Sequence, residues 1–368
     1  MQGKILIVGT NMMNIFHHRL ELIKALISSD YEVLVAAPKG REVEQLIKTG
    51  CRFINLDVDN RGTNIKNDLL LILNLRKICK REKPDVMLTF YTKTNIYGGL
   101  VARWLKIPYI ENITGLGSSF AKGEGRLYKI MAFLYKNAVK RAEIVFFQNT
   151  SNLKFFKDRE LYDGPYKMLP GSGVSLERYQ VLPYPDSEGT EFLFVSRILR
   201  EKGIVEYVKA AEKVGQRHRD VTFHVAGPCD PQFEDMLNDA DKRGVIKYHG
   251  KVYDMHSLYS GIHCTVLPSY YPEGMANVLL ESAACGRPII TTSLPGCGET
   301  VDDKVTGIVV KEMDVEDLAD AMERFVEMPR EQRVDMGKAG RKKMEREFDR
   351  EIVTREYMEA IRGIINKN

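Results

Sequence analysis

The sequence predicts an α/β protein made of two doubly wound, Rossmann-like domains in tandem. Three observations support this fold class. The length of 368 residues exceeds what one compact domain usually contains. Short, near-continuous apolar runs alternate with amphipathic stretches, a pattern typical of parallel strands that are buried on both faces. This alternation is interrupted at 170–189, a segment rich in Gly, Pro, Ser and Asp, and then starts again.

The first domain is expected over residues 1–180. Helical patterns such as HHRLELIKALISS and NDLLLILNLRKICKREK separate its apolar runs, which gives a βαβα order with helices on both faces of a parallel sheet. The predicted strands are KILIVGT (4–10), EVLVAAP (32–38), VMLTF (86–90), PYIENI (108–113) and EIVFFQN (143–149).

The second domain is expected over residues 181–349. Its apolar runs are again separated by helical patterns, and the chain is predicted to be helical from about residue 314 onward. The predicted strands are EFLFVSR (191–197), VTFHVAG (221–227), VIKYHG (245–250), HCTVLPS (263–269) and PIITTS (288–293).

Composition excludes several classes of protein. Hydrophobic residues make up 44% and charged residues 28%, as in ordinary globular proteins. No run approaches the roughly 18 apolar residues of a membrane span, and the opening MQGKILIVGT is predicted to be a strand rather than a signal peptide. The six cysteines form no CxxC pair and have no metal-like spacing with histidine, so we expect reduced, mostly buried thiols.

The net charge of +4 is divided unevenly along the chain. Residues 1–180 are strongly basic, whereas the rest of the chain is acidic. This asymmetry predicts that only the first domain meets an anionic surface. From charge alone, nucleic acid and anionic lipid are both candidates.

Two glycine-containing turns follow strands of the first domain. The first βα turn, VGTNMMNIFHHR, contains only Gly9 where a nicotinamide-binding fold requires GxGxxG, which argues against a dehydrogenase. The turn ENITGLGSSF (111–120) contains Gly115 and Gly117. Glycines there would let backbone amides approach an anion or a sugar closely, although a plain tight turn explains them equally well.

A pair of cations follows the first strand of the second domain. Arg197 lies at the carboxyl end of this strand, and Lys202 lies just ahead of the next helix. Two cations at this place could hold a diphosphate, Arg through its forked guanidinium and Lys as a point charge. The alternative is two solvated surface charges.

Two glutamates flank the start of another predicted helix, in YYPEGMANVLLESAACGRPIITT (270–292). Glu273 precedes this helix and Glu281 lies about two turns inside it, roughly 12 Å along the axis. Glycosidase carboxylate pairs lie about 5–9.5 Å apart, so this separation disfavours a shared catalytic atom. A helix cap with an unrelated surface charge is a second interpretation. The span fits a clamp for an elongated ligand, with hydroxyls at the two acids and phosphate at the amides of 274–277.

Four segments together resemble the family 4 retaining glycosyltransferases. They are SRILREKG, LPSYYPEGMANVLLESAACGRPIITT, PGCGETV and VTGIVV, and the resemblance covers essentially the whole chain. It implies the GT-B architecture, in which two Rossmann-like domains face each other across a cleft. It also implies that the C-terminal helix, 350–368, returns to the first domain.

The resemblance implies a role for individual residues. Arg197 and Lys202 would hold the donor diphosphate, and Glu281 would accept the ribose hydroxyls. The segment HGKV (249–252) resembles the turn whose backbone reads the nucleobase, most often uracil. Catalytic roles fall to Arg197, Lys202 and Glu273, and the other expected donor-binding residues are Gly274, Met275, Ala276, Asn277, Glu281, Val252 and Gly9.

The first domain resembles the branch that builds capsular polysaccharides and lipid-linked oligosaccharides. The relevant segments are NIFHHRLELIKAL, ITGLGSSF, FFQN and LPGSGVSLERY. This branch implies a UDP-sugar donor of a hexose or N-acetylhexosamine and a polyprenyl-diphosphate-linked sugar as acceptor. Many relatives have a histidine where this chain has Thr114. The expected acceptor-side residues are His17, Arg19, Thr114, Gly115 and Gly117.

The helix predicted over 125–141 combines apolar and basic side chains. Such a helix can lie on anionic lipid, which predicts a peripheral protein on the cytoplasmic face of the membrane. The alternative is a helix that faces the core and has a solvated basic back. No metal is expected, because the two cations already serve the diphosphate and no DxD-like acidic pair follows a strand. No cofactor and no nucleic-acid partner are expected either.

The predicted reaction is front-face transfer with retention of configuration and no obligate covalent intermediate. Two other functions fit the same features. A sugar-nucleotide epimerase shares the two-domain architecture and would need no acceptor. A non-catalytic protein that binds sugar nucleotides or nucleic acid is also compatible with the basic first domain.

Overall fold

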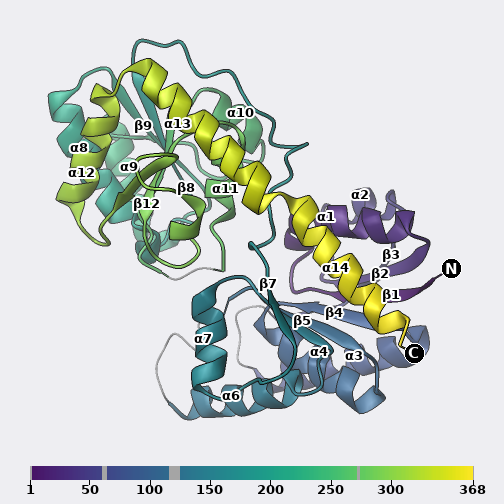
Figure 1. The fold of residues 1–368 in the computed structure, drawn as a ribbon. Coiled ribbons are helices and arrows are strands. Elements are labelled where there is room, and N and C mark those ends of the chain that lie inside the picture. Colours follow the sequence, from purple (N-terminus) through teal and green to yellow (C-terminus); the bar gives the residue numbers. More distant parts are fainter. Residues whose placement is uncertain (1, 60–63, 116–124, 272–273, 368) are drawn as a thin grey trace. The chain divides into compact units, whose positions relative to one another are not determined.

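The computed structural model describes residues 2–59, 64–115, 125–271 and 274–367 (Figure 1). The chain divides into two compact units. Unit 1 contains Met1–Ser172 together with Arg350–Asn368, and unit 2 contains Gly173–Asp349. The division lies after Ser172, inside the predicted linker and before residue 180. As expected for this fold class, the last helix belongs to unit 1.

Unit 1 contains a parallel seven-stranded sheet in the order β3-β2-β1-β4-β5-β6-β7. The central strand β1 pairs with β2 on one side and with β4 on the other, so that Ile5 lies opposite both Val33 and Val86. All five strands predicted for this half are present. The strands are β1 (Gly3–Val8), β2 (Tyr31–Ala37), β3 (Arg52–Asn55), β4 (Val86–Phe90), β5 (Tyr109–Ile113), β6 (Ile144–Phe147) and β7 (Tyr166–Met168).

Helices cover both faces of the unit 1 sheet (Figure 1). One apolar cluster joins the sheet to α1, α2 and α14, and a second joins it to α3, α4, α6 and α7. The helices are α1 (Met12–Ser28), α2 (Val43–Ile47), α3 (Ile65–Glu82), α4 (Thr92–Leu105), α6 (Arg126–Val139), α7 (Thr150–Asp158) and α14 (Arg350–Ile365).

The C-terminal helix α14 is held in unit 1 by specific contacts. The guanidinium of Arg350 donates to the His17 carbonyl oxygen at 2.8 Å and to the Glu21 carboxylate at 3.0 Å. About two turns further along α14, the ring of Tyr357 packs edge-on against Phe146, with 4.9 Å between the centroids. Polar contacts at its start and aromatic packing in its middle therefore fix α14 beside α1.

Unit 2 contains a parallel six-stranded sheet in the order β10-β9-β8-β11-β12-β13. The five strands predicted for this half are present, and β13 adds a sixth. The elements are β8 (Thr190–Val195), α8 (Ile204–Arg217), β9 (Val221–Ala226), α9 (Glu234–Lys242), β10 (Lys247–Tyr248), α10 (Met255–Ser260), β11 (Cys264–Leu267), α11 (Asn277–Ala284), β12 (Ile289–Thr292), β13 (Gly307–Val310), α12 (Val315–Glu327) and α13 (Arg330–Lys343).

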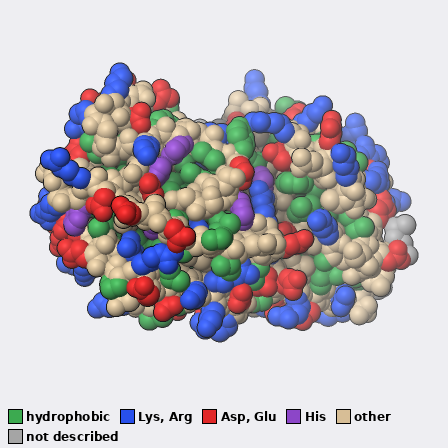
Figure 2. Space-filling view, turned by 90° about the horizontal axis from the view of Figure 1, so that it is seen from above, with side chains coloured by type: hydrophobic (Ala, Val, Ile, Leu, Met, Phe, Trp, Pro, Cys, Tyr) green, Lys and Arg blue, Asp and Glu red, His purple; other side chains and the backbone are tan. Residues whose placement is uncertain are grey.

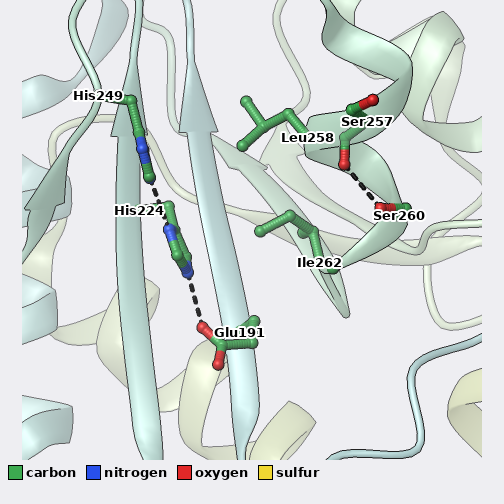
Figure 3. A pocket seen from close by; sticks show the side chains of 8 residues that line it. Glu191, His224, His249, Ser257, Leu258, Ser260 and Ile262 are labelled. Atoms are coloured by element: carbon green, nitrogen blue, oxygen red, sulfur yellow. Dashed lines mark hydrogen bonds and ion pairs between the residues drawn. The ribbon is translucent and has the colours of Figure 1, made fainter.

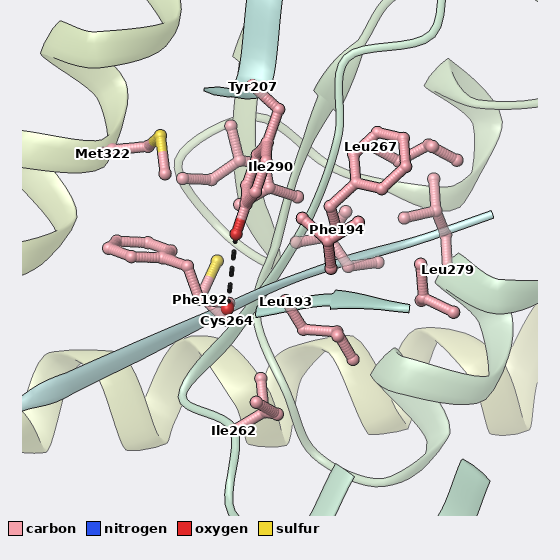
Figure 4. Packing of buried hydrophobic residues seen from close by; sticks show 14 of the residues in the cluster. Phe192, Leu193, Phe194, Tyr207, Ile262, Cys264, Leu267, Leu279, Ile290 and Met322 are labelled. Carbon is pink, nitrogen blue, oxygen red and sulfur yellow. Dashed lines mark hydrogen bonds between the residues drawn. The ribbon is translucent and has the colours of Figure 1, made fainter. Parts of the chain in front are cut away.

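The core of unit 2 is built on aromatic packing around β8 (Figure 4). Phe192 stacks on Phe223 with 5.7 Å between ring centroids, and the buried Tyr207 hydroxyl donates to the Phe192 carbonyl oxygen at 3.3 Å. Cysteines join this packing as small apolar side chains: Cys264 and Cys285 are fully buried, and burial raises the pKa of Cys285 to about 12. All six cysteines of the chain are free thiols.

A buried histidine makes the stability of unit 2 dependent on pH. His263 is 2% exposed, and its Nδ1 accepts a hydrogen bond from the backbone N–H of Glu191 at 3.1 Å. Burial, assisted by the charge of Arg333, lowers the pKa of His263 to about 4. The unfolded chain therefore binds the proton first, and stability is lost as the pH falls from about 6.5 towards 4.

We expect His263→Asn to remove most of this acid-induced loss. Asn can place its Oδ1 where Nδ1 accepts, and it has no proton to gain. The parent chain should lose about 3 kcal/mol of unfolding free energy between pH 7 and pH 4 through this group. Urea denaturation followed by circular dichroism at both pH values measures the difference. An equal loss in the variant would show that His263 is not the group responsible.

Candidate active site

The strand order of unit 2 reverses between β8 and β11, and ligands of open α/β sheets bind at the carboxyl ends of strands around such a point. The loops that follow β8 and β11 are bonded together here: the Tyr270 amide donates to the Glu201 carbonyl oxygen at 2.9 Å, and the Ser269 hydroxyl donates to the same oxygen at 3.2 Å. The hydroxyl of Thr292, the last residue of β12, donates to the Ser269 carbonyl oxygen at 2.7 Å. Three strand ends therefore form one fixed edge.

Gly203 sets the position of the short 3₁₀ turn η1 (Arg200–Lys202) on this edge. Its φ of 79° lies in the left-handed region, and an added Cβ would lie 2.3 Å from the carbonyl oxygen of Pro268. Both the backbone conformation and the close approach of the β11 loop therefore require glycine. Lys202, the residue before it, is held at the same place.

We expect Gly203→Ala to lower the free energy of unfolding by at least about 2 kcal/mol, because the strained φ and the clash act together. Chemical denaturation followed by circular dichroism measures this loss. Gly215→Ala on α8 is the matched control, since its added Cβ would meet only Phe223, at 3.7 Å. That change should leave stability equal or higher by up to about 1 kcal/mol. Equal effects of the two substitutions would contradict this account of Gly203.

The two predicted diphosphate cations differ in their surroundings. Arg197 follows β8 directly and is exposed, and among the residues that the structure describes it has no hydrogen-bond or ion-pair partner. Lys202 is only 6% exposed. A lysine is rarely buried to this degree, so the surrounding structure specifies the position of Lys202.

The helix predicted within MANVLLESAACG (275–286) is shorter than this pattern. It is α11, which begins at Asn277, and Ala276 at its N-cap position has no side chain that could cap it. The Ala276 amide donates to the Gly296 carbonyl oxygen at 2.8 Å, and the Asn277 amide donates to the Met275 carbonyl oxygen at 3.1 Å. The expectation that the amides of this segment are available to a donor sugar therefore needs correction at these two positions.

Side-chain acceptors on α11 lie one turn apart. The Oδ1 atom of Asn277 is buried and has no hydrogen-bond partner among the described residues. Glu281 is four residues further on and lies on the same side of the helix. Burial, and to a lesser degree the charge of Glu281, raise the pKa of the neighbouring Tyr259 well above its usual value. The helix therefore offers an amide oxygen and a carboxylate on one side.

Two predicted site residues, Glu273 and Gly117, lie outside the described residues. Val252 and Gly274 are described: Val252 packs partly buried against the unit 2 core, and Gly274 is half-buried after the gap. The turn predicted to read the nucleobase contains Gly250, whose φ of 61° is left-handed. The Gly227 amide donates to the Gly250 carbonyl oxygen at 2.7 Å, which ties this turn to the end of β9.

A chain of polar side chains that the sequence pattern did not predict lies next to this turn (Figure 3). His249 Nε2 and His224 Nδ1 are 2.7 Å apart, and His224 Nε2 is 2.6 Å from a Glu191 carboxylate oxygen. Burial, and then the charge of His224, lower the pKa of His249. The side chains of Glu191, His224 and His249 line an open cavity of about 300 Å³. The other lining residues are Ser257, Leu258, Ser260, Gly261 and Ile262. Because Glu191 is near the start of β8, this cavity extends away from the edge that carries Arg197.

Gly9 and Arg19 have structural roles in unit 1. A Cβ on Gly9 would lie 2.6 Å from the Ile15 side chain, so glycine is required for α1 to pack on the end of β1. Arg19 is 2% exposed, and its guanidinium lies 4.3 Å from the centroid of the Phe90 ring. It therefore lies inside unit 1 rather than on its surface. His17, the other candidate on α1, is half-buried.

The carboxyl edge of the unit 1 sheet brings together the ends of β4 and β5. Thr114 and Gly115 follow β5, and a Cβ on Gly115 would meet open space. The Thr92 hydroxyl donates to the Gly115 carbonyl oxygen at 3.4 Å. Tyr91 has a φ of 76°, which is uncommon for a residue other than glycine and is often found at functional sites. Tyr91 was not among the predicted site residues. Its position directly after the predicted strand VMLTF, where ligands of such sheets bind, could have identified it as a candidate.

The described residues contain neither a metal-binding cluster nor a membrane-spanning helix. No cluster of three or more His, Cys, Asp or Glu side chains is arranged to hold a metal ion within the described ranges. Among the helices described, none has both the length and the apolar character of a membrane span.

Two family models match the chain, one in each half. Residues 4–149 match the glycosyl transferase 4-like family, and residues 184–343 match the glycosyl transferases of group 1. The chain therefore consists of two glycosyltransferase domains, a 4-like domain followed by a group 1 domain. The resemblance inferred from the sequence motifs is thereby confirmed, and the enzyme class is that of a glycosyltransferase.

Curated relatives of this glycosyltransferase act in glycan assembly. It is 26% identical to the N,N'-diacetylbacillosaminyl-diphospho-undecaprenol alpha-1,3-N-acetylgalactosaminyltransferase of Campylobacter jejuni, over 96% of each chain. It is 23% identical to a capsular polysaccharide biosynthesis glycosyltransferase of Staphylococcus aureus, over 91% of this chain and 90% of the relative. It is also 23% identical, over 73% of each chain, to the UDP-Gal:alpha-D-GlcNAc-diphosphoundecaprenol alpha-1,3-galactosyltransferase of Escherichia coli.

Solved structures share the fold of this glycosyltransferase. Sucrose-phosphate synthase of Thermosynechococcus elongatus matches with a TM-score of 0.82 at 18% identity over the whole of both chains. HepE of Anabaena, in complex with UDP and glucose, matches with a TM-score of 0.80 at 16% identity, over 98% of this chain and all of the other. The two-domain GT-B architecture predicted from the sequence is confirmed.

Proposed function

We propose that this glycosyltransferase moves a hexose or an N-acetylhexosamine from a UDP-sugar to a polyprenyl-diphosphate-linked sugar. The observation that carries the proposal is the similarity, over 96% of the chain, to a transferase whose acceptor is a sugar on diphospho-undecaprenol. The E. coli relative, with UDP-Gal in its name, supports a UDP-sugar as donor.

The carboxyl edge of unit 2 supplies the groups that such a donor requires. Arg197 and Lys202 provide two positive charges for the diphosphate. The Oδ1 of Asn277, which is buried and has no hydrogen-bond partner among the described residues, and the carboxylate of Glu281 provide acceptors for hydroxyls on one side of α11. The turn that ends at Val252 provides backbone groups for the base.

The proposed reaction retains the configuration at the anomeric carbon. The acceptor hydroxyl oxygen attacks this carbon on the face of the leaving group, the bond from the carbon to the UDP oxygen breaks, and a donor phosphate oxygen takes the hydroxyl proton. The enzyme contributes orientation and stabilises the charge on the departing UDP. Glu111, the carboxylate nearest in sequence to Thr114, is fully buried, and burial raises its pKa well above the usual value. It is therefore not suited to act as a nucleophile.

We also propose that the transfer is metal-independent and takes place at the cytoplasmic face of the membrane. The cations that would replace a metal are Arg197 and Lys202. Helix α6 has a buried side, with Tyr135 and Ala138, and an exposed side with Ile130 and Phe133. The core-facing interpretation therefore accounts for only one side of α6. The exposed side, which is flanked by lysines, is the part suited to anionic lipid.

The test is UDP release from a panel of UDP-sugars, with and without polyprenyl-diphosphate-linked sugars, in the presence of EDTA. We expect release that depends on both one donor and one acceptor. Acceptor-independent release of UDP with an altered free sugar would instead indicate an epimerase. No release in EDTA that returns with Mg²⁺ would contradict the metal-independent part of the proposal alone.

A further inference from the structure

Helix α3 is apolar on two sides. Its inner side packs into the unit 1 core through Leu71, Leu75 and Ile78. A helix on the surface of a globular protein usually has polar residues on the other side. Here the outer side of the first half of the helix presents large apolar residues instead, with exposed fractions of 83% for Ile65, 55% for Leu69, 56% for Leu70 and 50% for Leu73.

A groove between α3 and α4 continues this apolar surface. It has a volume of about 460 Å³ and is lined by Leu69, Ile72, Leu73, Arg76, Trp104 and Leu105. Asp68 fixes the two helices relative to each other, because its carboxylate accepts from Lys93 at 2.9 Å and from the Tyr97 hydroxyl at 2.8 Å. The polar contacts of Asp68 therefore fix the shape of the groove on the surface of unit 1.

Trp104, the only tryptophan of the chain, lies in this groove and is 60% exposed. Tryptophan has a large apolar ring and one polar N–H group, so it is enriched where an apolar phase meets water. A tryptophan this exposed beside three exposed leucines fits such a boundary.

Exposed cations surround the groove. Arg76, Lys77, Lys80 and Lys106 are all exposed, and within the described part of the chain none of them has an ion-pair partner. On the face of the molecule seen in Figure 2, by contrast, Lys and Arg side chains lie among Asp and Glu side chains. We call Leu69, Leu70, Leu73 and Trp104, with these four cations, the α3–α4 surface.

We propose that the α3–α4 surface binds an anionic lipid bilayer at its interface. Leu69, Leu73 and Trp104 enter the boundary between headgroups and acyl chains, while the four cations contact lipid phosphates. A second copy of the chain is the less suitable occupant, because a two-fold contact would bring the same unpaired cations together. The inference rests on the proposed function in one respect only, namely that a polyprenyl-linked acceptor lies in a membrane.

The experiment uses Trp104 as a natural probe in the full chain. We expect vesicles of equal parts phosphatidylcholine and phosphatidylglycerol to shift its emission to the blue and to protect it from acrylamide, and high salt to weaken both effects. Vesicles of phosphatidylcholine alone should bind weakly. Replacing both Leu69 and Leu73 with Glu should lower vesicle affinity, measured by co-sedimentation, by at least about ten-fold.

Ile47→Glu on α2 is the matched control, since Ile47 is 49% exposed and lies outside the α3–α4 surface. It should leave vesicle binding unchanged, and both variants should keep the circular dichroism spectrum of the parent.

The proposal is overturned if the parent does not bind anionic vesicles, or if Ile130→Glu and Phe133→Glu on α6 abolish binding while the α3 variant binds normally. Concentration-dependent self-association that the α3 variant removes would also overturn it. UDP release with a water-soluble acceptor analogue should be unaffected by the α3 variant, which separates this inference from the proposed function.

Discussion

Replacing Arg197 or Lys202 with alanine is expected to lower kcat by about 100- to 1000-fold. Both residues follow β8, at the carboxyl edge of the unit 2 sheet where the strand order reverses. Transfer of the sugar leaves negative charge on the departing diphosphate, and a positive group that is already in place stabilises this charge without reorganisation. Lys202 is expected to have the larger effect, because at 6% exposure its charge is screened less by water than that of the exposed Arg197.

A buried lysine also contributes packing, so a second variant separates the two roles. Lys202→Met keeps an unbranched chain of similar length and removes only the charge. It should lose kcat as Lys202→Ala does, with the melting temperature near that of the parent. Lys209→Ala, which removes an exposed cation from α8, is the control and should keep normal turnover. Near-normal kcat in the Arg197 and Lys202 variants would remove them from the active site.

Replacing Glu281 with alanine is expected to weaken UDP binding by about 10- to 100-fold while kcat falls much less. Losing a hydrogen bond from a ribose hydroxyl to a charged group costs about 1.5–3 kcal/mol, which corresponds to roughly 10- to 100-fold in affinity. The ribose takes no part in bond breaking, so this energy is the same in the ground state and in the transition state. Its loss therefore raises KM for the donor rather than lowering kcat.

Isothermal titration with UDP measures the Glu281 effect directly. Glu281→Gln keeps the shape and one acceptor oxygen, so its affinity should lie between those of the parent and the alanine variant. Glu312→Ala, at an exposed position between β13 and α12, is the charge-matched control. A loss of kcat with unchanged UDP affinity would assign Glu281 to the chemical step instead. Glu273→Ala, by contrast, is expected to impair recognition of the donor sugar and to lower turnover.

The periodicity of the sequence predicted most of the fold, because both sheets are parallel and buried on both faces. Ten apolar runs were assigned as strands and all ten are present. The short strands β3, β7 and β13 were missed. The exposed or half-buried residues of β3 and β7 do not form an apolar run, so edge strands of this kind carry little signal. The edge strand β13 is mostly buried but has only four residues.

The sequence predicted the place of the candidate site better than its details. Residues that follow strands, such as Arg197 and Thr114, could be assigned to a sheet edge from topology alone. The start of α11 could not, since the contact of the Ala276 amide with Gly296 joins two loops that are distant in sequence. Arg19 was predicted to be an acceptor-side residue, yet it is buried and packs on Phe90. Packing of this kind between α1 and β4 is not encoded in local spacing.

Buried polar groups were the least predictable features. Glu111 lies in the run PYIENI, and both of its carboxylate oxygens are buried without a hydrogen-bond partner among the described residues. Glu191 lies in β8, His224 lies in β9 and His249 directly follows β10, so these three hydrogen-bonded residues are far apart in sequence. Only the pairing of β10, β9 and β8 brings them together.

The product of the reaction gives the most direct test of the central claim, that the chain is a retaining transferase acting on a lipid-linked sugar. After incubation with the active UDP-sugar, the polyprenyl-diphosphate acceptor should be heavier by one sugar residue in mass spectrometry. The anomeric proton of the new linkage should show, by NMR, the same configuration as the donor. An inverted configuration, or turnover of the donor with no change in the mass of the acceptor, would contradict the account.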